Sequence, residues 1–132
     1  MVELVDHTSE LELRIRTRTL DGVYREALEA LARELVDAPP GVERERRPVE
    51  LDASGPDTLL ADLLNEAIYL SETGGFVAEG LEVDELSEGR LAGALLGYLH
   101  ADARPVVKAA TYHGLELVRD ADGWRASVVL DV

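Results

Sequence analysis

Apolar and polar residues alternate strictly along the segment 11–19. Leu11, Leu13, Ile15 and Thr17 fall on one side, and the charged residues between them fall on the other. A period of two is typical of a strand with one buried face, because successive side chains of a strand point to opposite sides. We therefore expect residues 11–19 to form a half-buried strand.

Two later segments carry apolar residues at steps of three and four, which is the spacing of one face of an α-helix. The stripe of the first segment, residues 21–37, consists of Leu20, Tyr24, Leu28, Leu31 and Leu35. We expect Asp21 to cap the start of this helix and the Pro-Pro-Gly run at 39–41 to stop it. The second helix is expected to open at Pro56 and to end at Gly74 and Gly75.

The rest of the chain is rich in strand patterns. Short apolar or alternating runs occupy residues 49–53, 76–86, 90–99, 106–111, 113–119 and 124–131. The last two runs flank a turn at 120–123, with Gly123 where a positive φ is needed. The element order predicts an α+β fold, a two-layer single domain in which two main helices pack on a mainly antiparallel β-sheet.

Composition and charge exclude several functional classes. Thirteen Lys and Arg against 27 Asp and Glu give a net charge of −14. Such a surface repels phosphates, so we expect no direct nucleic-acid binding. The absence of cysteine excludes disulfides, thiol nucleophiles and thiolate metal sites. No apolar run of 18 residues and no secretory signal pattern are present, so we expect no membrane span and no secretion.

The motifs of common catalytic sites are missing from the sequence. No serine lies in a nucleophile elbow, no Gly-rich phosphate loop is present, and no two histidines have the spacing of a zinc helix. Carboxylates are abundant, but there is no EF-hand loop. Any Ca²⁺ or Mg²⁺ site must therefore be assembled from separated segments.

Three segments are unusual for a soluble chain of this size. Polar residues crowd the entrance to the first predicted strand at 6–10, and residues 108–114 begin with Lys108, the only lysine. An apolar strand pattern also runs to Val132 at the end of the sequence, where most chains are polar and mobile. We therefore expect the α-carboxylate of Val132 to be positioned, with Asp131 on the polar face beside it.

These segments resemble the archease family. Asp6-His7-Thr8-Ser9-Glu10-Leu11 is similar to the family's Asp-His-Thr-Ala-Asp-hydrophobic opening, with Ser and Glu in place of Ala and Asp. The family's middle and late motifs match residues 64–70 (Leu-Asn-Glu-Ala-Ile-Tyr-Leu) and 108–115 (Lys-Ala-Ala-Thr-Tyr-His-Gly-Leu). Trp-Arg-Ala at 124–126 and the final Asp-Val pair complete the resemblance. It spans nearly the whole chain, so we expect residues 1–132 to form a single archease-like domain.

The resemblance implies a function that residue patterns alone do not. Archeases are accessory proteins of the RtcB-type RNA ligase, and they promote its guanylylation and repeated turnover in tRNA splicing and RNA repair. We therefore expect a cytoplasmic protein that is not an enzyme and whose partner is such a ligase. Two alternatives stay open: a small metal-dependent hydrolase, and a general chaperone or modulator of nucleic-acid-processing proteins.

The resemblance also implies a bound divalent cation, typically calcium, with Glu10, Asp131 and Val132 as ligands. The polar pattern agrees, because Glu10 and Asp131 both project from the polar side of amphipathic strands. If these strands approach each other, the carboxylates cluster and repel until a cation intervenes. Glu10 stands where the family usually has Asp, and Asp6 is the substitute ligand if the longer side chain does not fit.

The remaining candidates contact a partner or stabilise the fold. We expect His7 and Lys108 to contact the partner. Lys108 would contact the ligase itself or the phosphate of its bound nucleotide. For His7, a hydrogen-bonded histidine at the strand entrance is the favoured alternative. We interpret Asn65 and Glu66 as structural hydrogen-bonding residues. The arginines within 14–18 are interpreted as an outer sheet face paired with carboxylates.

Overall fold

The computed structural model of the chain describes residues 1–7, 9–37, 43–100, 103 and 106–132. These residues form seven strands and two helices, in the order β1 (Val2–His7), β2 (Glu10–Thr17), α1 (Leu20–Leu35), β3 (Glu45–Asp52), α2 (Pro56–Gly74), β4 (Phe76–Leu86), β5 (Arg90–Leu99), β6 (Ala109–Asp120) and β7 (Gly123–Asp131).

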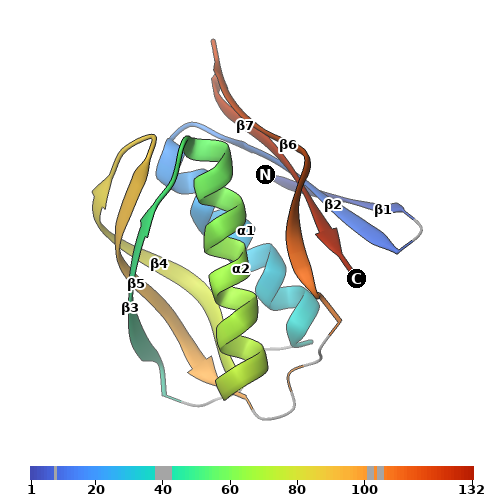
Figure 1. The fold of residues 1–132 in the computed structure, drawn as a ribbon, viewed down its shortest axis with the longest axis vertical. Helices are drawn as coiled ribbons and strands as arrows, with labels where there is room; N and C mark the ends of the chain where they lie inside the picture. The colour runs from blue at the N-terminus through green and yellow to red at the C-terminus, as the bar shows by residue number, and fades with distance from the viewer. Residues whose placement is uncertain (8, 38–42, 101–102, 104–105) are drawn as a thin grey trace.

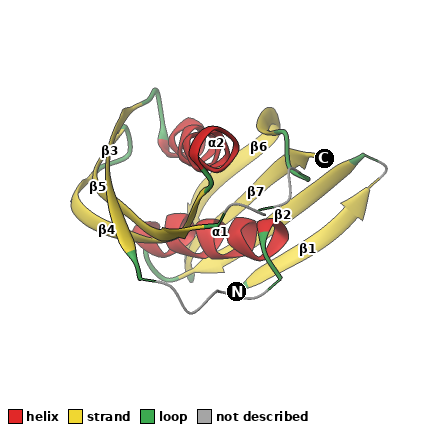
Figure 2. Ribbon diagram, turned by 90° about the horizontal axis from the view of Figure 1, so that it is seen from below, coloured by secondary structure: helices red, strands yellow, loops and turns green. Residues whose placement is uncertain are grey.

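The strands form two antiparallel sheets (Figure 1). The four-stranded sheet has the order β1-β2-β7-β6, and the three-stranded sheet has the order β3-β5-β4. Each helix contacts both sheets, α1 mainly through β4 and β2, and α2 mainly through β6 and β4. Figure 2 shows the helices in the centre with a sheet on either side. The predicted α+β class is confirmed. The division of the strands between two sheets is not predicted from the sequence, which indicates a single β-sheet.

Strands β2 and β7 show the alternation that the sequence predicts. Their buried side chains are Leu11, Leu13, Ile15, Ala126, Val128 and Leu130. The charged residues between them lie on the outer face of the four-stranded sheet, which we define as the face away from the helices. The buried residues of both sheets and both helices form one hydrophobic core, as expected for one domain.

The first helix is confirmed, but its predicted cap is wrong. Thr19 is the N-cap residue, and its Oγ1 accepts a hydrogen bond from the Gly22 N–H at 3.3 Å. Asp21 lies in the first turn, where its charge complements the positive end of the helix dipole. The helix ends at Leu35, and the Pro-Pro-Gly run expected to stop it lies outside the described residues.

The second helix follows its predicted boundaries. Pro56 is its first residue, and Gly75 caps its end with a φ of 67°. The Gly75 N–H bonds the carbonyls of Leu70 and Ser71. This left-handed conformation strains residues that carry a Cβ, which is why glycine is favoured there. In the part of the chain that the structure describes, neither helix is long and apolar enough to cross a membrane.

Two strands differ from the sequence prediction. β1 is not predicted, because the apolar residues of Val2–His7 do not alternate strictly with polar ones, yet all six residues pair with β2. β3 begins at Glu45, four residues before the strand pattern expected at 49–53. Pro48 is tolerated in β3 because β3 is an edge strand, where a missing N–H need not break the ladder.

The strands predicted at 106–111 and 113–119 are one strand, β6, with a large bulge. Thr111 pairs with Val129 and Glu116 pairs with Ser127, so residues 112–115 of β6 lie opposite a single residue of β7. Gly114 in this bulge has a φ of 67°. The bulge therefore coincides with the late motif that carries Tyr112 and His113.

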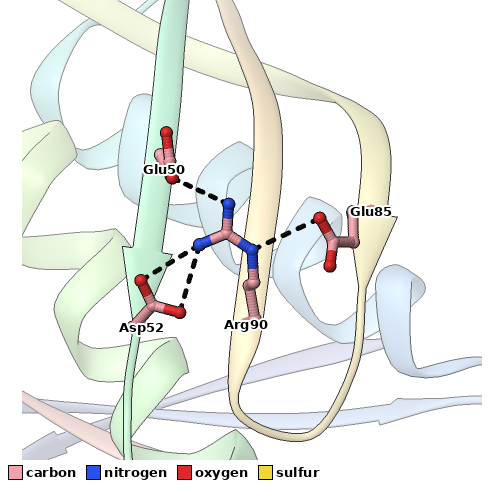
Figure 3. A network of polar contacts seen from close by, with 4 residues as sticks. All are labelled: Glu50, Asp52, Glu85 and Arg90. Atoms are coloured by element: carbon pink, nitrogen blue, oxygen red, sulfur yellow. Dashed lines mark hydrogen bonds and ion pairs between the residues drawn. The ribbon is translucent and has the colours of Figure 1, made fainter.

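Arg90 joins the three strands of the three-stranded sheet (Figure 3). Its guanidinium lies 2.7 Å from Glu50 Oε1, 3.0 Å from Asp52 Oδ2 and 3.3 Å from Glu85 Oε2. Glu50 and Asp52 belong to β3 and Glu85 belongs to β4, so one arginine of β5 ties both neighbouring strands. Hydrogen bonds to Glu50, and then to Asp52 and Glu85, raise the pKa of Arg90.

Replacing Arg90 by alanine should lower the midpoint of urea unfolding, because Glu50, Asp52 and Glu85 then lose their shared counter-charge. The loss should shrink in about 1 M NaCl, where the Debye length is ~3 Å and exposed charges are screened. The matched control is Arg33→Ala, at an exposed arginine of α1, which should unfold close to the wild-type midpoint. A loss that does not respond to salt would rule out the electrostatic explanation.

Candidate functional site

Glu10 and Asp131 lie opposite each other on neighbouring strands. Glu10 is the first residue of β2, Asp131 is the last residue of β7, and the two are paired in the register. The next pair, Leu11 and Leu130, is buried. Because side chains alternate along a strand, those of Glu10 and Asp131 point to the outer face, where both are exposed. The two strand ends that the sequence analysis expects to approach each other are therefore adjacent.

Backbone hydrogen bonds hold the end of the sequence at the same place. The Val132 N–H donates to the Ser9 carbonyl at 3.2 Å, and the Lys108 N–H donates to the Asp131 carbonyl at 2.8 Å. Ser9 has a φ of 63°, which is uncommon for a residue other than Gly, Asn or Asp. The opening, late and final motifs thus meet at one end of the four-stranded sheet.

The electrostatics of this cluster favour a cation. Two carboxylates directly opposite each other on paired strands repel, and the α-carboxylate of Val132 adds negative charge beside Asp131. All of these groups offer oxygen, the donor that Ca²⁺ and Mg²⁺ take, whereas zinc sites use mainly His and Cys. Among the described side chains, no group of three or more His, Cys, Asp or Glu is arranged to hold a metal. A cation here would therefore take further oxygens from the main chain, the chain end or water.

Asp6 and His7 lie on the neighbouring strand β1. Asp6 pairs with Leu11, whose side chain is buried, so Asp6 belongs to the opposite side of the sheet from Glu10. Asp6 is therefore poorly placed to replace Glu10 as a ligand. The backbone of His7 pairs with Glu10, but its side chain lies outside the described part of the structure, and its partner contact stays a prediction.

Lys108 lies at the same end of the sheet as the two carboxylates. It directly precedes β6, its side chain is exposed, and the next residue, Ala109, pairs with Asp131. The unique lysine thus lies at the same end of the four-stranded sheet as Glu10 and Asp131. Its contact with a partner stays a prediction.

Asn65 of α2 closes the free edge of β6. Its Nδ2 donates to the Ala110 carbonyl at 3.1 Å, and its Oδ1 accepts from the Ala110 N–H at 2.8 Å. The side-chain amide replaces the backbone of a neighbouring strand, which confirms the structural hydrogen bond expected at Asn65. Close by, the Tyr112 hydroxyl donates to Asp62 Oδ1. This hydrogen bond is the main cause that raises the pKa of Tyr112.

An Asn65→Asp variant should be destabilised at pH 7 by about 1–3 kcal/mol, because a carboxylate cannot donate to the Ala110 carbonyl. At pH 4 part of the loss should be recovered, since a protonated carboxyl supplies an O–H donor. Urea unfolding at both pH values, relative to wild type, measures this. Asn65→Ala is the control and should lose the same stability at both pH values. An Asp variant without pH dependence would show that the amide donor is unimportant.

The arginines on the outer face of β2 pair with carboxylates, as the sequence analysis interprets them. Arg14 Nε lies 2.8 Å from Glu12 Oε2, and Arg16 Nη1 lies 3.6 Å from Asp120 Oδ2. These pairs give the middle of the outer face a mixed charge. Among the described residues, no such arginine pair is found for Glu10 and Asp131 at the end of the sheet.

Sequence reasoning missed one contact at this site. The Ser9 carbonyl accepts a hydrogen bond from the Val132 N–H. A backbone carbonyl leaves no side-chain signal in a sequence. The signal that was available is indirect: a strand pattern that continues to Val132 needs a neighbour for its last N–H.

Comparison with known proteins identifies the family. The model of the archease protein family (MTH1598/TM1083) matches residues 3–132. The archease of Methanopyrus kandleri is 33% identical over 139 residues, which cover 98% of both chains. The archease of Methanosarcina barkeri is 30% identical over 138 residues, 98% of this chain and 94% of that protein.

Solved structures share the fold. The solution structure of Methanobacterium thermoautotrophicum protein 1598 aligns with a TM-score of 0.73 and 24% identity, over 99% of this chain and 98% of that one. The crystal structure of an archease from Thermotoga maritima, described as a possible chaperone, aligns with a TM-score of 0.70 and 20% identity, over 100% and 98%. The family match spans nearly the whole sequence, so this chain belongs to the archease family.

Proposed function

We propose that this protein is a cytoplasmic, cation-binding accessory protein that activates an RtcB-type RNA ligase. It promotes guanylylation of the ligase and so supports repeated turnover in tRNA splicing and RNA repair. Membership of the archease family supports this role. The observation that carries it is the pairing of Glu10 with Asp131, with Val132 bound to Ser9 beside them.

Glu10, Asp131 and Val132 are the residues that would hold the cation, and their oxygen donors favour calcium. The bound cation supplies the positive charge that offsets the repulsion among these groups. The chain contributes their placement: the β2–β7 register keeps both side chains on the open outer face, and the Val132–Ser9 bond fixes the chain end. Lys108, at the same end of the sheet, would contact the ligase or its nucleotide phosphate.

A general chaperone or modulator of nucleic-acid-processing proteins is the second candidate. It is favoured by the Thermotoga maritima relative, which is described as a possible chaperone. Both candidates assign the chemistry to the partner, and neither requires this chain to be an enzyme. They differ in selectivity, because the first predicts an effect on one ligase and the second an effect on many unrelated proteins.

The test is the turnover of the cognate RNA ligase with GTP, with and without this protein. Wild type should raise the number of ligations per ligase molecule above one, and Asp131→Asn should lower this gain by about tenfold or more. Glu29→Gln, at an exposed carboxylate of α1, is the matched control and should activate like wild type. No activation by wild type would remove the proposal. Equal effects on unrelated enzymes would favour the chaperone, and phosphoester hydrolysis without ligase would favour the hydrolase.

A further inference from the structure

The two sheets have four edges, and three of them are closed. The edge of β6 is bonded by Asn65. The edge strand β4 has two register shifts, is packed against α1, and has its Leu81 carbonyl bonded by Arg25 Nε at 3.3 Å. The edge strand β3 contains Pro48, which lacks an N–H. Proteins protect sheet edges by such covers, bulges and prolines, because an open edge accepts a further strand.

The fourth edge, β1, carries none of these devices in the described part of the chain. Its six residues pair with β2 in an unbroken register, with no proline and no bulge. No described strand pairs with its other side. Figure 2 shows β1 at the margin of the four-stranded sheet, next to β2.

The hydrogen-bond alternation shows which backbone groups of β1 are open. Met1 and Arg16 exchange both hydrogen bonds, with N···O distances of 2.8 and 2.9 Å. In an antiparallel ladder such pairs recur at every second residue, so Glu3 and Val5 also direct their N–H and C=O groups to β2. The N–H and C=O groups of Val2, Leu4 and Asp6 therefore point away from the sheet. They form a row of donors and acceptors along a strand of about 20 Å.

The side chains beside this row select the kind of partner. Leu4 is 47% exposed, which is high for a large apolar residue in a strand. Glu3 and Asp6 are exposed carboxylates on the same strand, and the chain as a whole carries a net charge of −14. Pairing with a second copy would bring two such charges together, whereas a basic segment is attracted.

We propose that the outer edge of β1 is a docking site for an extended, basic segment of a partner protein, which adds to the four-stranded sheet as a fifth strand. Main-chain hydrogen bonds to Val2, Leu4 and Asp6 provide the attachment, as in other cases of strand addition. An apolar residue of the segment covers Leu4, and the Lys or Arg residues on the other face of the segment meet Glu3, which lies on the opposite side of β1 from Leu4. This surface is separate from the Glu10–Asp131 cluster and does not depend on the ligase proposal.

The test uses the full chain labelled with ¹⁵N and a ten-residue probe peptide of alternating lysine and valine. On binding, the amides of Val2, Leu4 and Asp6 should become at least about tenfold slower to exchange their hydrogens, whereas those of Glu3 and Val5 are already bonded and should change little. Leu4→Pro removes one outward N–H and leaves the bonds to β2 intact. It should bind the peptide about tenfold more weakly than Leu4→Ala, which keeps the N–H.

A second probe, used with the wild-type chain, does not depend on the folding of Leu4→Pro. It also separates strand pairing from the general attraction of a basic peptide to an acidic protein. The same peptide with N-methylated valines keeps its charge but loses half of its backbone donors, and it should not protect the three amides. Equal protection by both peptides, or equal binding to the proline and alanine variants, would overturn the proposal. A dimer of the chain that Leu4→Pro abolishes would also overturn it, because a second copy would then occupy the edge.

Discussion

Gly97→Ala is expected to lower the free energy of unfolding by about 3 kcal/mol, the upper end for overpacking a core. A Cβ at Gly97 would lie 2.0 Å from the Val77 carbonyl oxygen and 3.0 Å from Phe76 Cζ. The carbonyl is backbone of β4, which pairs with β5 at this point. Relief therefore requires a shift of the β4–β5 pairing rather than a rotamer change. Urea unfolding followed by circular dichroism measures the loss.

Gly74→Ala is the matched control for this prediction. Gly74 is the last residue of α2, and a Cβ there meets nothing within 4 Å. Alanine at this position should be neutral or stabilise by about 0.5–1 kcal/mol, because glycine loses more conformational freedom on folding. Similar effects of the two substitutions would show that the close approach of β4 and β5 is not what requires glycine at 97.

Calcium should raise the thermal unfolding midpoint of the wild-type protein, and Asp131→Asn should remove most of this rise. A ligand that binds only the folded state stabilises it by about 2.7 kcal/mol when its free concentration is 100 times its dissociation constant. Asp131 supplies one of the two side-chain carboxylates at the site, so its amide loses most of that gain. Without calcium the variant should unfold at or above the wild-type midpoint, because the repulsion with Glu10 is removed. Differential scanning calorimetry with and without calcium measures both effects.

The control for the calcium effect is Glu29→Gln, which removes one exposed carboxylate far from β7 in the sequence. It should show the full calcium-dependent rise. If Glu29→Gln and Asp131→Asn lose the rise equally, calcium acts on the net charge of the protein and not at a defined site. A wild type that does not respond to calcium at all would count against any site for this ion.

The periodic parts of the fold could be predicted because one physical cause dominates them. β2, α1, α2 and β7 each bury one face, so their apolar residues repeat with the period of the element. The strands at 76–86 and 90–99 could be predicted with correct ends because Gly75 precedes the first and the polar run Ser-Glu-Gly at 87–89 separates the two.

The parts that could not be predicted depend on neighbours rather than on local pattern. β1 has a broken alternation and is a strand because β2 offers it a paired edge. The bulge in β6 places residues 112–115 opposite a single residue of β7. It becomes visible only when the two strands are aligned. The N-cap lies at Thr19, two residues before the predicted Asp21. Both side chains can cap a helix, so the sequence does not distinguish between them.

The candidate site was partly visible in the sequence. Glu10 and Asp131 could be singled out because both lie on the polar side of amphipathic strands, but their direct pairing needs the order β2-β7 in the sheet. The same register places Asp6 on the other side of the sheet, which the sequence could not show without β1. The Ser9–Val132 bond is a backbone contact and has no sequence signal.

Calorimetric titration with calcium tests most directly whether Glu10 and Asp131 form a cation site. The wild type should give a saturable heat for one ion, and the Glu10→Gln/Asp131→Asn double variant should give none. The Glu50→Gln/Asp52→Asn double variant removes two exposed carboxylates from β3 and should bind calcium like wild type. Saturable binding that survives in the Glu10/Asp131 variant, or no saturable binding in the wild type, would contradict the account.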